Sequence, residues 1–367
     1  MLCLNFGNFA QSILEVMRKL FVAMAFLSLV ALSSACKHEV DLFGDYREVP
    51  VIYGLLDAKA DTNFVKITRS FYTLGSAYTV AMNPDSSNYP GRLDVRLTEY
   101  CNGERIREIV LDTITIDDKQ SGVFYAPKQK LYYTTEKLGP NTSSRKYSYT
   151  LAVALPDSTI HVKADLVGSN AFKEKSLAVN FSKQYFGTQR PFYFYPALNA
   201  AYYEVDLAFT FKERRTPDSD SVPRTMHWKV NQYEDYYLAH HTGDDGTYVF
   251  TYRPETFYSV LREYLGDDTL TEGVVRLIGD YPIELVIRAC GKNLRQYIYF
   301  NDPANNVNPG DPEFSLVNGG LGVFSSRMTI RKKLKLAGET VPELMENKYW
   351  GFKFMGGDWK DGSTLPE

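Results

Sequence analysis

Residues 240–245 (HHTGDD) are the best candidates in this sequence for holding a metal ion. His240, His241 and Asp244 are the candidate ligands, because imidazole nitrogens and carboxylate oxygens bind divalent transition metals. Adjacent histidines on a strand point to opposite faces, so these two share an ion only if the segment is a turn. The spacing matches no regular zinc module, and the neighbouring glycines favour a polar hairpin turn. We therefore expect no metal and no cofactor, and these three side chains are weak candidates.

Other segments with catalytic or nucleotide-binding composition fail on their spacing. Residues 302–311 are rich in Asn, Asp and Pro but lack the alternating acids and the final glutamate of the known calcium loop. The glycines of residues 319–322 (GGLG) precede a predicted strand, so close backbone approach or a bulge explains them better than a phosphate site. No Gly-x-Ser-x-Gly elbow is present, and the acid pairs at 117–118 and 267–268 fall in predicted turns. The sequence therefore predicts a protein that is not an enzyme.

Aromatic side chains are the main candidates for ligand recognition. The chain holds 27 Tyr and 22 Phe, and they crowd in two segments. A ring presents a flat apolar face and tyrosine adds a polar rim, so exposed rings suit a glycan, a peptide or a partner protein. Strands also favour aromatic residues for packing, so the alternative is that these rings lie in the core. The candidate ligand-binding residues are Phe192, Tyr193, Phe194, Tyr195, Tyr233, Tyr236 and Tyr237.

Residues 1–35 have the three parts of a secretory signal peptide. Residues 18–19 (RK) form a positive region, residues 20–32 an apolar region, and residues 33–35 (SSA) a small-residue cleavage site. The apolar run is shorter than the roughly 20 residues that a permanent transmembrane helix needs. Translation is expected to start at Met17, which begins a complete signal by itself.

A cysteine follows the signal directly. Residues 32–36 (LSSAC) resemble the lipobox of bacterial lipoproteins, although Leu32 stands four places before the cysteine rather than three. The alternative is an ordinary signal that a cysteine happens to follow. We expect lipidation at Cys36, with residues 36–50 as a polar tether. The folded part would then work at the outer membrane, lipid-anchored and facing the periplasm or the cell surface.

Length, charge and cysteine content limit the classes of protein. Residues 36–367 are enough for two domains at roughly 150 residues each. Lys and Arg number 41 against 44 Asp and Glu, so the chain lacks the basic face that nucleic-acid binding requires. The one dense basic run, residues 327–335, is expected to be a solvated strand or turn. Cys101 and Cys290 are expected to be buried free thiols, with a disulfide between them as the alternative.

Alternation of apolar and polar residues dominates the chain and predicts strands with one packed and one solvated face. Apolar residues recurring from 257 to 265 predict a helix near residues 254–265, with Pro254 in its first turn and Gly266 at its end. A second helix is expected over residues 341–347. The predicted strands are residues 51–56, 64–69, 93–98, 105–111, 147–155, 159–166, 203–211, 226–231, 283–289 and 322–330.

Many short strands and few helices predict a mainly-β protein with two β-sandwich-like domains. Residues 51–170 are expected to form an immunoglobulin-like sandwich, since about 100 residues suffice for one. Residues 171–367 are expected to form a second β-rich domain, which carries the helical insert and long polar loops at 212–224 and 301–312.

Several short motifs are similar to those of uncharacterised envelope lipoproteins of Bacteroidota that share a domain of unknown function. That resemblance implies an accessory binding role beside TonB-dependent outer-membrane transport systems, and it assigns no catalytic residue. The motifs are the Cys36 start, residues 51–56 (VIYGLL), residues 65–70 (VKITRS), residues 149–153 (YTLAV) with Asp157, and residues 318–324 (NGGLGVF).

The sequence as a whole favours a lipid-anchored binding protein of the outer membrane or cell surface, with a TonB-dependent transporter as a candidate partner. One alternative is an adhesion or structural protein of the envelope, which would associate with itself or with other surfaces. A second is an envelope hydrolase without a recognisable motif, which would need carboxylates or histidines to converge in a cleft.

Overall fold

The computed structural model describes residues 48–168, 172–215, 219–239, 242–243, 245–266, 274–302, 315–346, 351–352 and 354–356. The chain divides into two compact units, Met1–Arg47 and Glu48–Glu367, and the described residues belong to the second. The predicted signal peptide, Met17, Cys36, His240, His241, Asp244 and residues 267–268 and 303–311 lie outside the described ranges. Within those ranges, no helix is long and apolar enough to span a membrane.

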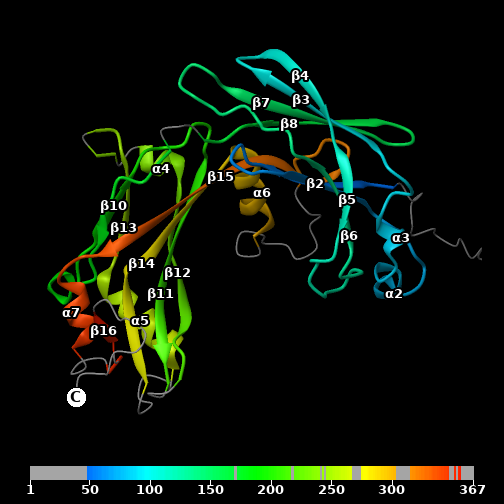
Figure 1. The fold of residues 1–367 in the computed structure, drawn as a ribbon. Helices are drawn as coiled ribbons and strands as arrows, with labels where there is room; N and C mark the ends of the chain where they lie inside the picture. The colour runs from blue at the N-terminus through cyan, green and yellow to red at the C-terminus, as the bar shows by residue number, and fades with distance from the viewer. Residues whose placement is uncertain are drawn as a thin grey trace, which may run out of the picture. The chain divides into compact units, whose positions relative to one another are not determined.

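Strands make up 47% of the described residues and helices 16%, so the mainly-β prediction is confirmed. All the strands predicted from alternation are present, and the long ones extend well beyond their predicted ends. In the described part of the chain they form a ten-stranded, a four-stranded and a two-stranded sheet (Figure 1). The ten-stranded and four-stranded sheets supply most of the residues of the hydrophobic cores.

The N-terminal strands form a sandwich of two sheets. One sheet has the order β4-β3-β7-β8, and β1, β2, β6 and β5 belong to the other. Ile52 and Val65 from one sheet and Leu97 and Leu151 from the other are buried in the same hydrophobic cluster. The strands are β1 (Pro50–Leu56), β2 (Asn63–Arg69), β3 (Asp94–Cys101), β4 (Glu104–Val110), β5 (Asp112–Ile116), β6 (Gln129–Thr134), β7 (Tyr147–Ala154) and β8 (Thr159–Asp165).

The C-terminal strands surround a second, aromatic-rich core. Long strands in the order β12-β11-β14-β15 form its main sheet, and the pair β10-β13 packs against the same core. The ring of Phe181 stacks on that of Phe257 at 4.0 Å between centroids. The strands are β9 (Ala178–Val179), β10 (Arg190–Phe194), β11 (Tyr202–Arg214), β12 (Val222–Glu234), β13 (Tyr248–Tyr252), β14 (Val275–Cys290), β15 (Leu321–Leu336) and β16 (Phe354–Gly356).

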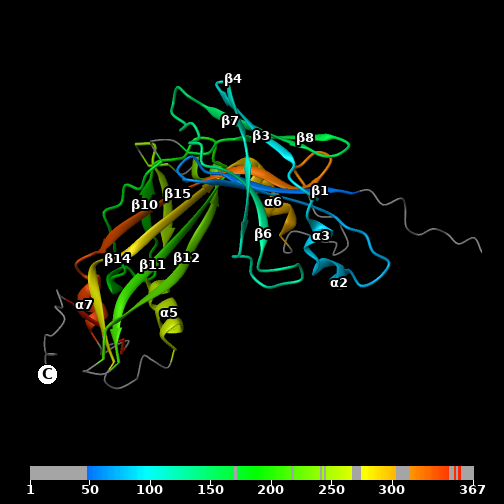
Figure 2. The ribbon, with the colours of Figure 1, turned by 45° about the vertical axis from the view of Figure 1, so that its right-hand side comes forward.

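β15 serves both cores. Its first half pairs in parallel with β1, from Val51↔Leu321 to Leu56↔Ser326, and its second half pairs antiparallel with β14. Figures 1 and 2 show it running from the β1 side of the molecule to the β14 side. The motifs at 51–56 and 318–324 are therefore hydrogen-bonded neighbours. The division into two domains stays a prediction, and the structure adds that one strand joins the two cores.

Glycines allow β1 and β15 to approach each other closely. A Cβ on Gly322 would lie 2.2 Å from the carbonyl oxygen of Ile52, and Gly322 has a φ of +102°, which side chains rarely adopt. A Cβ on Gly54 would lie 2.8 Å from the ring of Phe324. Close backbone approach therefore accounts for Gly322, whereas a Cβ on Gly319 would meet nothing within 4 Å.

The helix predicted near 254–265 is confirmed with its predicted ends. Pro254 occupies the first turn, and Gly266, at a φ of 54°, caps the C-terminus of α5. The second predicted helix, α7, ends at Met345 rather than at 347. The helices are α2 (Ala77–Ala81), α3 (Pro84–Ser87), η1 (Lys183–Tyr185), α4 (Asp235–Ala239), α5 (Pro254–Leu265), α6 (Lys292–Asn301) and α7 (Thr340–Met345).

The prediction of a long polar loop over residues 212–224 is wrong at both ends, because β11 continues to Arg214 and β12 begins at Val222. Glu213 is buried there, whereas Lys212 and Arg215 are exposed. The Glu213 carboxylate accepts a hydrogen bond from Arg276 at 3.0 Å, and Arg276 is fully buried. The composition indicates a loop, but the two ends of the stretch are strand, and a tertiary ion pair is buried at the first of them.

The two cysteines of the folded part are free thiols, as predicted. Cys290 is buried, whereas Cys101 is half-buried rather than fully buried. The basic run is also confirmed as a solvated strand, because Arg331, Lys332 and Lys333 lie exposed on β15.

Replacing Gly322 with alanine is expected to destabilise the protein strongly. Gly322→Ala would force a side chain against the Ile52 carbonyl at positive φ, and we expect the free energy of unfolding to fall by about 2–4 kcal/mol. Gly338→Ala is the matched control, since a Cβ there meets nothing within 4 Å, and its effect should stay within about 1 kcal/mol. Urea unfolding measures both, and equal effects would contradict the close approach.

Candidate functional site

The structure separates the predicted aromatic residues rather than gathering them on one surface. Phe192 and Phe194 are buried at 1% and 0% exposure, because β10 pairs with β13 and alternate residues of β10 face the core. Tyr193, between them, is 37% exposed. Tyr195 is half-buried, and Tyr233 packs partly buried against the core, its ring 4.8 Å from that of Phe250. The side chains of Tyr236 and Tyr237 lie outside what the structure describes.

The aromatic segment lies beside a buried carboxylate. Glu174 forms an isolated β-bridge with Phe194, and its side chain is 3% exposed. Its nearest ion-pair partner is Lys332 of β15, at 3.9 Å. Burial raises the pKa of Glu174 above the ordinary value, and the charge of Lys332 opposes that rise. This arrangement has the character of a structural contact rather than a ligand site.

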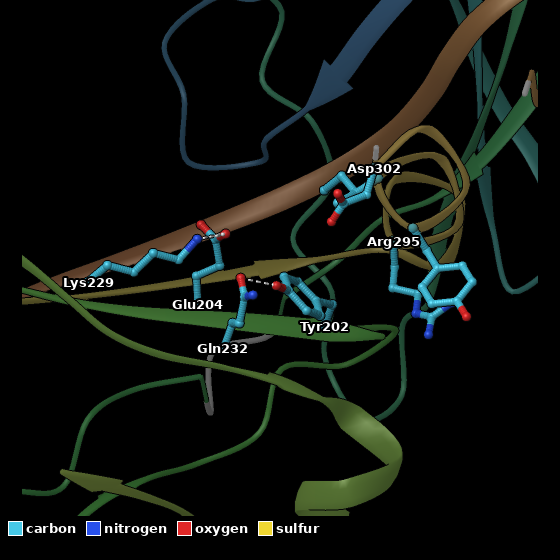
Figure 3. Close-up of a pocket in the computed structure, with 8 residues that line it drawn as sticks. Tyr202, Glu204, Lys229, Gln232, Arg295 and Asp302 are labelled. Atoms are coloured by element: carbon cyan, nitrogen blue, oxygen red, sulfur yellow. Dashed lines mark hydrogen bonds and ion pairs between the residues drawn. The ribbon is translucent and has the colours of Figure 1, made fainter. Parts of the chain in front are cut away.

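A pocket of about 390 Å³ opens between the β11–β12 hairpin and helix α6 (Figure 3). Its volume lies in the range typical of small-molecule sites. The hairpin supplies one wall and the helix supplies the other. The lining residues are Tyr202, Glu204, Lys229, Gln232, Arg295, Ile298, Tyr299 and Asp302.

A β-bulge determines which side chains of the hairpin reach the pocket. Glu204 lies opposite Gln232, but the next pair on that face is Asp206 with Lys229, because the register shifts between Val205 and Asp206. In a regular strand, residues three apart point to opposite faces. The extra residue of β12, Val230, moves Lys229 to the same face as Gln232, so both line the pocket.

Helix α6 provides the other wall through one of its faces. Arg295, Ile298, Tyr299 and Asp302 recur at the spacing of a single helical face. Another face holds the helix in place. There the hydroxyl groups of Tyr53 and Tyr297 lie 3.0 Å apart, and the Leu294 N–H donates to Ser325 Oγ at 3.1 Å.

The start of α6 is positioned by the end of strand β14. Gly291 is the N-cap and follows Cys290, the last residue of β14. Cys290 pairs with Tyr202 at the start of β11, and its carbonyl accepts from the Ala201 N–H at 2.8 Å. The helix therefore begins next to the strand residues that form the opposite wall.

The pocket combines balanced charges with aromatic faces. Lys229 donates to Glu204 at 3.1 Å, and the Tyr202 hydroxyl donates to Gln232, as Figure 3 shows. Across from them, the guanidinium of Arg295 lies 4.7 Å from the centre of the Tyr299 ring. Two acidic and two basic side chains line the cavity, so no net charge selects for an ion. Donors, acceptors and flat apolar surfaces face the same volume.

The described residues offer no cluster of metal ligands. No set of three His, Cys, Asp or Glu side chains could hold a metal ion within the described ranges. The candidate ligands at 240, 241 and 244 lie outside those ranges. The chain matches no known family model and no curated protein.

None of the lining residues was among the sequence candidates. They come from two separate segments, residues 202–232 and 295–302, and the bulge that moves Lys229 leaves no mark in the alternation. A sequence signal does exist for α6, because 295, 298, 299 and 302 share a helical spacing. The aromatic run Tyr297–Phe300 hides it, since such a run is also typical of a strand.

Neutralising Glu174 is expected to stabilise the protein at neutral pH. A raised pKa means that the folded state holds the proton more tightly than the unfolded chain. The stability that the protonated Glu174 contributes is therefore present at low pH and is lost as pH rises through the raised pKa. Glu174→Gln should therefore be more stable than the parent at pH 7 and equal to it below about pH 4. Urea titrations at both pH values measure this, with Glu104→Gln, an exposed change on β4, as control. A gap that persists in acid would contradict the assignment.

Pocket substitutions are expected to leave stability nearly intact. The Glu204 and Lys229 side chains are 31% and 56% exposed, and exposed ion pairs contribute little, so Glu204→Gln should change the unfolding free energy by less than about 1 kcal/mol. Glu213→Gln, by contrast, removes a carboxylate that faces fully buried Arg276, and we expect a loss of about 3 kcal/mol. Thermal unfolding of both variants checks the contrast, and a large loss in Glu204→Gln would mean that the pocket wall is a folding element.

Proposed function

We propose that this chain is a lipid-anchored binding protein of the bacterial outer membrane or cell surface, which holds a neutral oligosaccharide in the pocket between β11–β12 and α6. The observation that carries the proposal is the pocket itself, with two tyrosine rings and both donors and acceptors around one cavity. The sequence of residues 18–36 supports the location, because a signal with a cysteine at its end is typical of lipoproteins.

The composition of the pocket favours a sugar as the ligand. A sugar ring has an apolar face that packs on an aromatic ring, and hydroxyl groups that both donate and accept hydrogen bonds. Tyr202 and Tyr299 supply rings, while Gln232, Glu204 and Lys229 supply polar groups. The equal number of acids and bases suits a ligand without charge, because an anion or cation would leave one pair of side chains unmatched.

An accessory role beside a TonB-dependent transporter is part of this proposal. It is supported by the similarity of residues 51–56 and 318–324 to motifs of Bacteroidota envelope lipoproteins. In that role, the protein captures the ligand at the surface and the transporter carries it across the membrane. Affinity purification from the native membrane should then recover a transporter together with this chain.

Titration with a panel of neutral hexasaccharides tests the pocket directly. Laminarihexaose, cellohexaose, xylohexaose and maltohexaose are suitable probes for calorimetry with the purified protein. At least one should bind, and Tyr299→Ala should weaken it roughly tenfold, since losing a stacked ring costs about 1.4 kcal/mol. Glu204→Gln should weaken it as well, by removing an acceptor for hydroxyl groups.

Tyr281→Ala is the matched control for these variants, because Tyr281 is an exposed tyrosine on β14 that does not line the pocket. Its affinity should equal that of the parent. A panel that does not bind, or a bound sugar indifferent to Tyr299→Ala, would overturn the proposal.

A further inference from the structure

A cluster of large apolar side chains lies exposed on the N-terminal sandwich, far in sequence from the pocket residues. Six of them are between 44% and 84% exposed, whereas large apolar groups usually lie inside. We call this cluster the α2 patch, and its members are Tyr72, Leu74, Tyr78, Met82, Val123 and Phe124. Exposed apolar patches on soluble parts of proteins mark surfaces that contact a protein or a membrane.

Two segments form the patch, and a backbone hydrogen bond joins them. Residues 72–82 lead into and through α2, and Val123 and Phe124 belong to the connection between β5 and β6. The Tyr125 N–H donates to the carbonyl of Ala81, the last residue of α2, at 3.0 Å. Figures 1 and 2 both show this connection beside α2. The two segments therefore adjoin each other at the end of α2.

The segment of the patch that contains α2 is almost without charge. From residue 71 to residue 91 the only charged side chain is Asp85, in a protein of which 23% of residues are charged. The Lys119 ammonium lies 5.5 Å from the centre of the Phe124 ring, at the edge of the patch. A surface that enters an apolar medium must avoid charge, because moving an unpaired charge out of water is costly.

The polypeptide from the N-terminus enters the fold next to the patch. Val49 donates to Ser70 Oγ at 2.9 Å, and its carbonyl accepts from the Ser70 N–H at 2.8 Å. Arg69 pairs with Glu48 at 2.7 Å and donates to the carbonyl of Asp85, in α3, at 3.0 Å. The first described residues are thus bound to Arg69 and Ser70, at the start of the segment that carries α2, and Arg69 in turn contacts α3.

We propose that the α2 patch rests on the surface of a lipid bilayer. This inference rests on the proposed lipid anchor at Cys36, because the eleven residues 37–47 then span at most about 40 Å between the anchor and Glu48. The patch begins at Tyr72, two residues after Ser70, to which Val49 is bound, so the anchor holds it within reach of the membrane at high effective concentration. The patch contacts the headgroups and the upper acyl region of the bilayer.

The residue types match that depth of the membrane. Tyrosines are enriched at the level of the headgroups, where the ring is apolar and the hydroxyl stays hydrated. Leu74, Met82 and Phe124 would enter just below them, as apolar side chains of interfacial segments do. Contact at the patch as well as at the acyl chains would restrict how the folded part tilts on its tether.

Quenching by brominated lipids tests the contact in the full lipidated chain. Tyr78→Trp places a fluorescent reporter in the patch, and Tyr281→Trp places one at another exposed tyrosine, on β14. The proteins are reconstituted into vesicles of phosphatidylcholine brominated near the headgroup end of its acyl chains. We expect the added emission of Tyr78→Trp to be quenched and shifted to the blue, while that of Tyr281→Trp is unchanged. Equal emission from the two reporters would overturn the inference.

A second reporter protects the test against effects of the substitution itself. Phe124→Trp should show the same quenching, and adding Leu74→Ser and Met82→Ser should reverse it while the protein stays bound to the vesicles by its lipid. Quenching that survives both serines would overturn the inference. Cross-linking of the patch between two copies, without quenching, would overturn it in favour of a self-association surface.

Labelling of cells with an alkyne fatty acid separates the anchor from the patch. If the label is present on the parent chain and lost in Cys36→Ala, it supports the proposed anchor, whatever the quenching shows. An unlabelled chain would overturn the anchor, and with it the tether argument for the patch. A labelled chain without quenching at Tyr78→Trp would overturn the patch alone.

Discussion

The parallel pairing of β1 with the first half of β15 is the contact on which the rest of the structure depends. It joins a strand near the start of the described chain to one near its end, so the N-terminal core is completed by residues far away in sequence. Parallel strands need such a crossover. Phe324, opposite Gly54, belongs to the same cluster as the N-terminal strands, whereas Met328 and Leu334 of the same β15 belong to the other core. The close contact requires glycine, because any side chain at Gly322 would meet the Ile52 backbone.

The pocket is a consequence of that pairing rather than an addition to it. β14 lies beside β15, and α6 begins where β14 ends, with Leu294 held by Ser325 of β15. The helix can therefore face the β11–β12 hairpin only when both strands are in register. The bulge in β12 then turns Lys229 outward without moving Trp228 from the core. Such bulges re-aim single side chains while the sheet stays intact. The two walls of the pocket are a paired hairpin and a docked helix, so both are held by hydrogen bonds.

Polar residues inside the protein are used for tertiary connection. Glu213 and Arg276 pair within the sheet, and Arg276 also donates to the Phe352 carbonyl at 2.7 Å, which holds the C-terminal segment beside β16. Glu99 accepts from Tyr149 at 2.7 Å within the first sandwich. Buried groups of this kind require partners, because an unpaired one is costly. The surface, in contrast, carries the exposed apolar side chains of the α2 patch. The binding site and the lipid-contacting face that we propose lie on different parts of the fold.

The sequence by itself determined the mainly-β class, the positions of the long strands, helix α5 with its Pro254 and Gly266 ends, and the exposed basic run on β15. These features are local, since alternation, capping and turn residues act within a few neighbours. Only the tertiary structure decided that Phe192 and Phe194 face the core, because that depends on pairing with β13. It also decided that β11 and β12 extend into both ends of residues 212–224, where Glu213 is buried against Arg276. The pocket required three elements brought together from across the chain and one bulge that changes which face Lys229 occupies, and no local pattern encodes either.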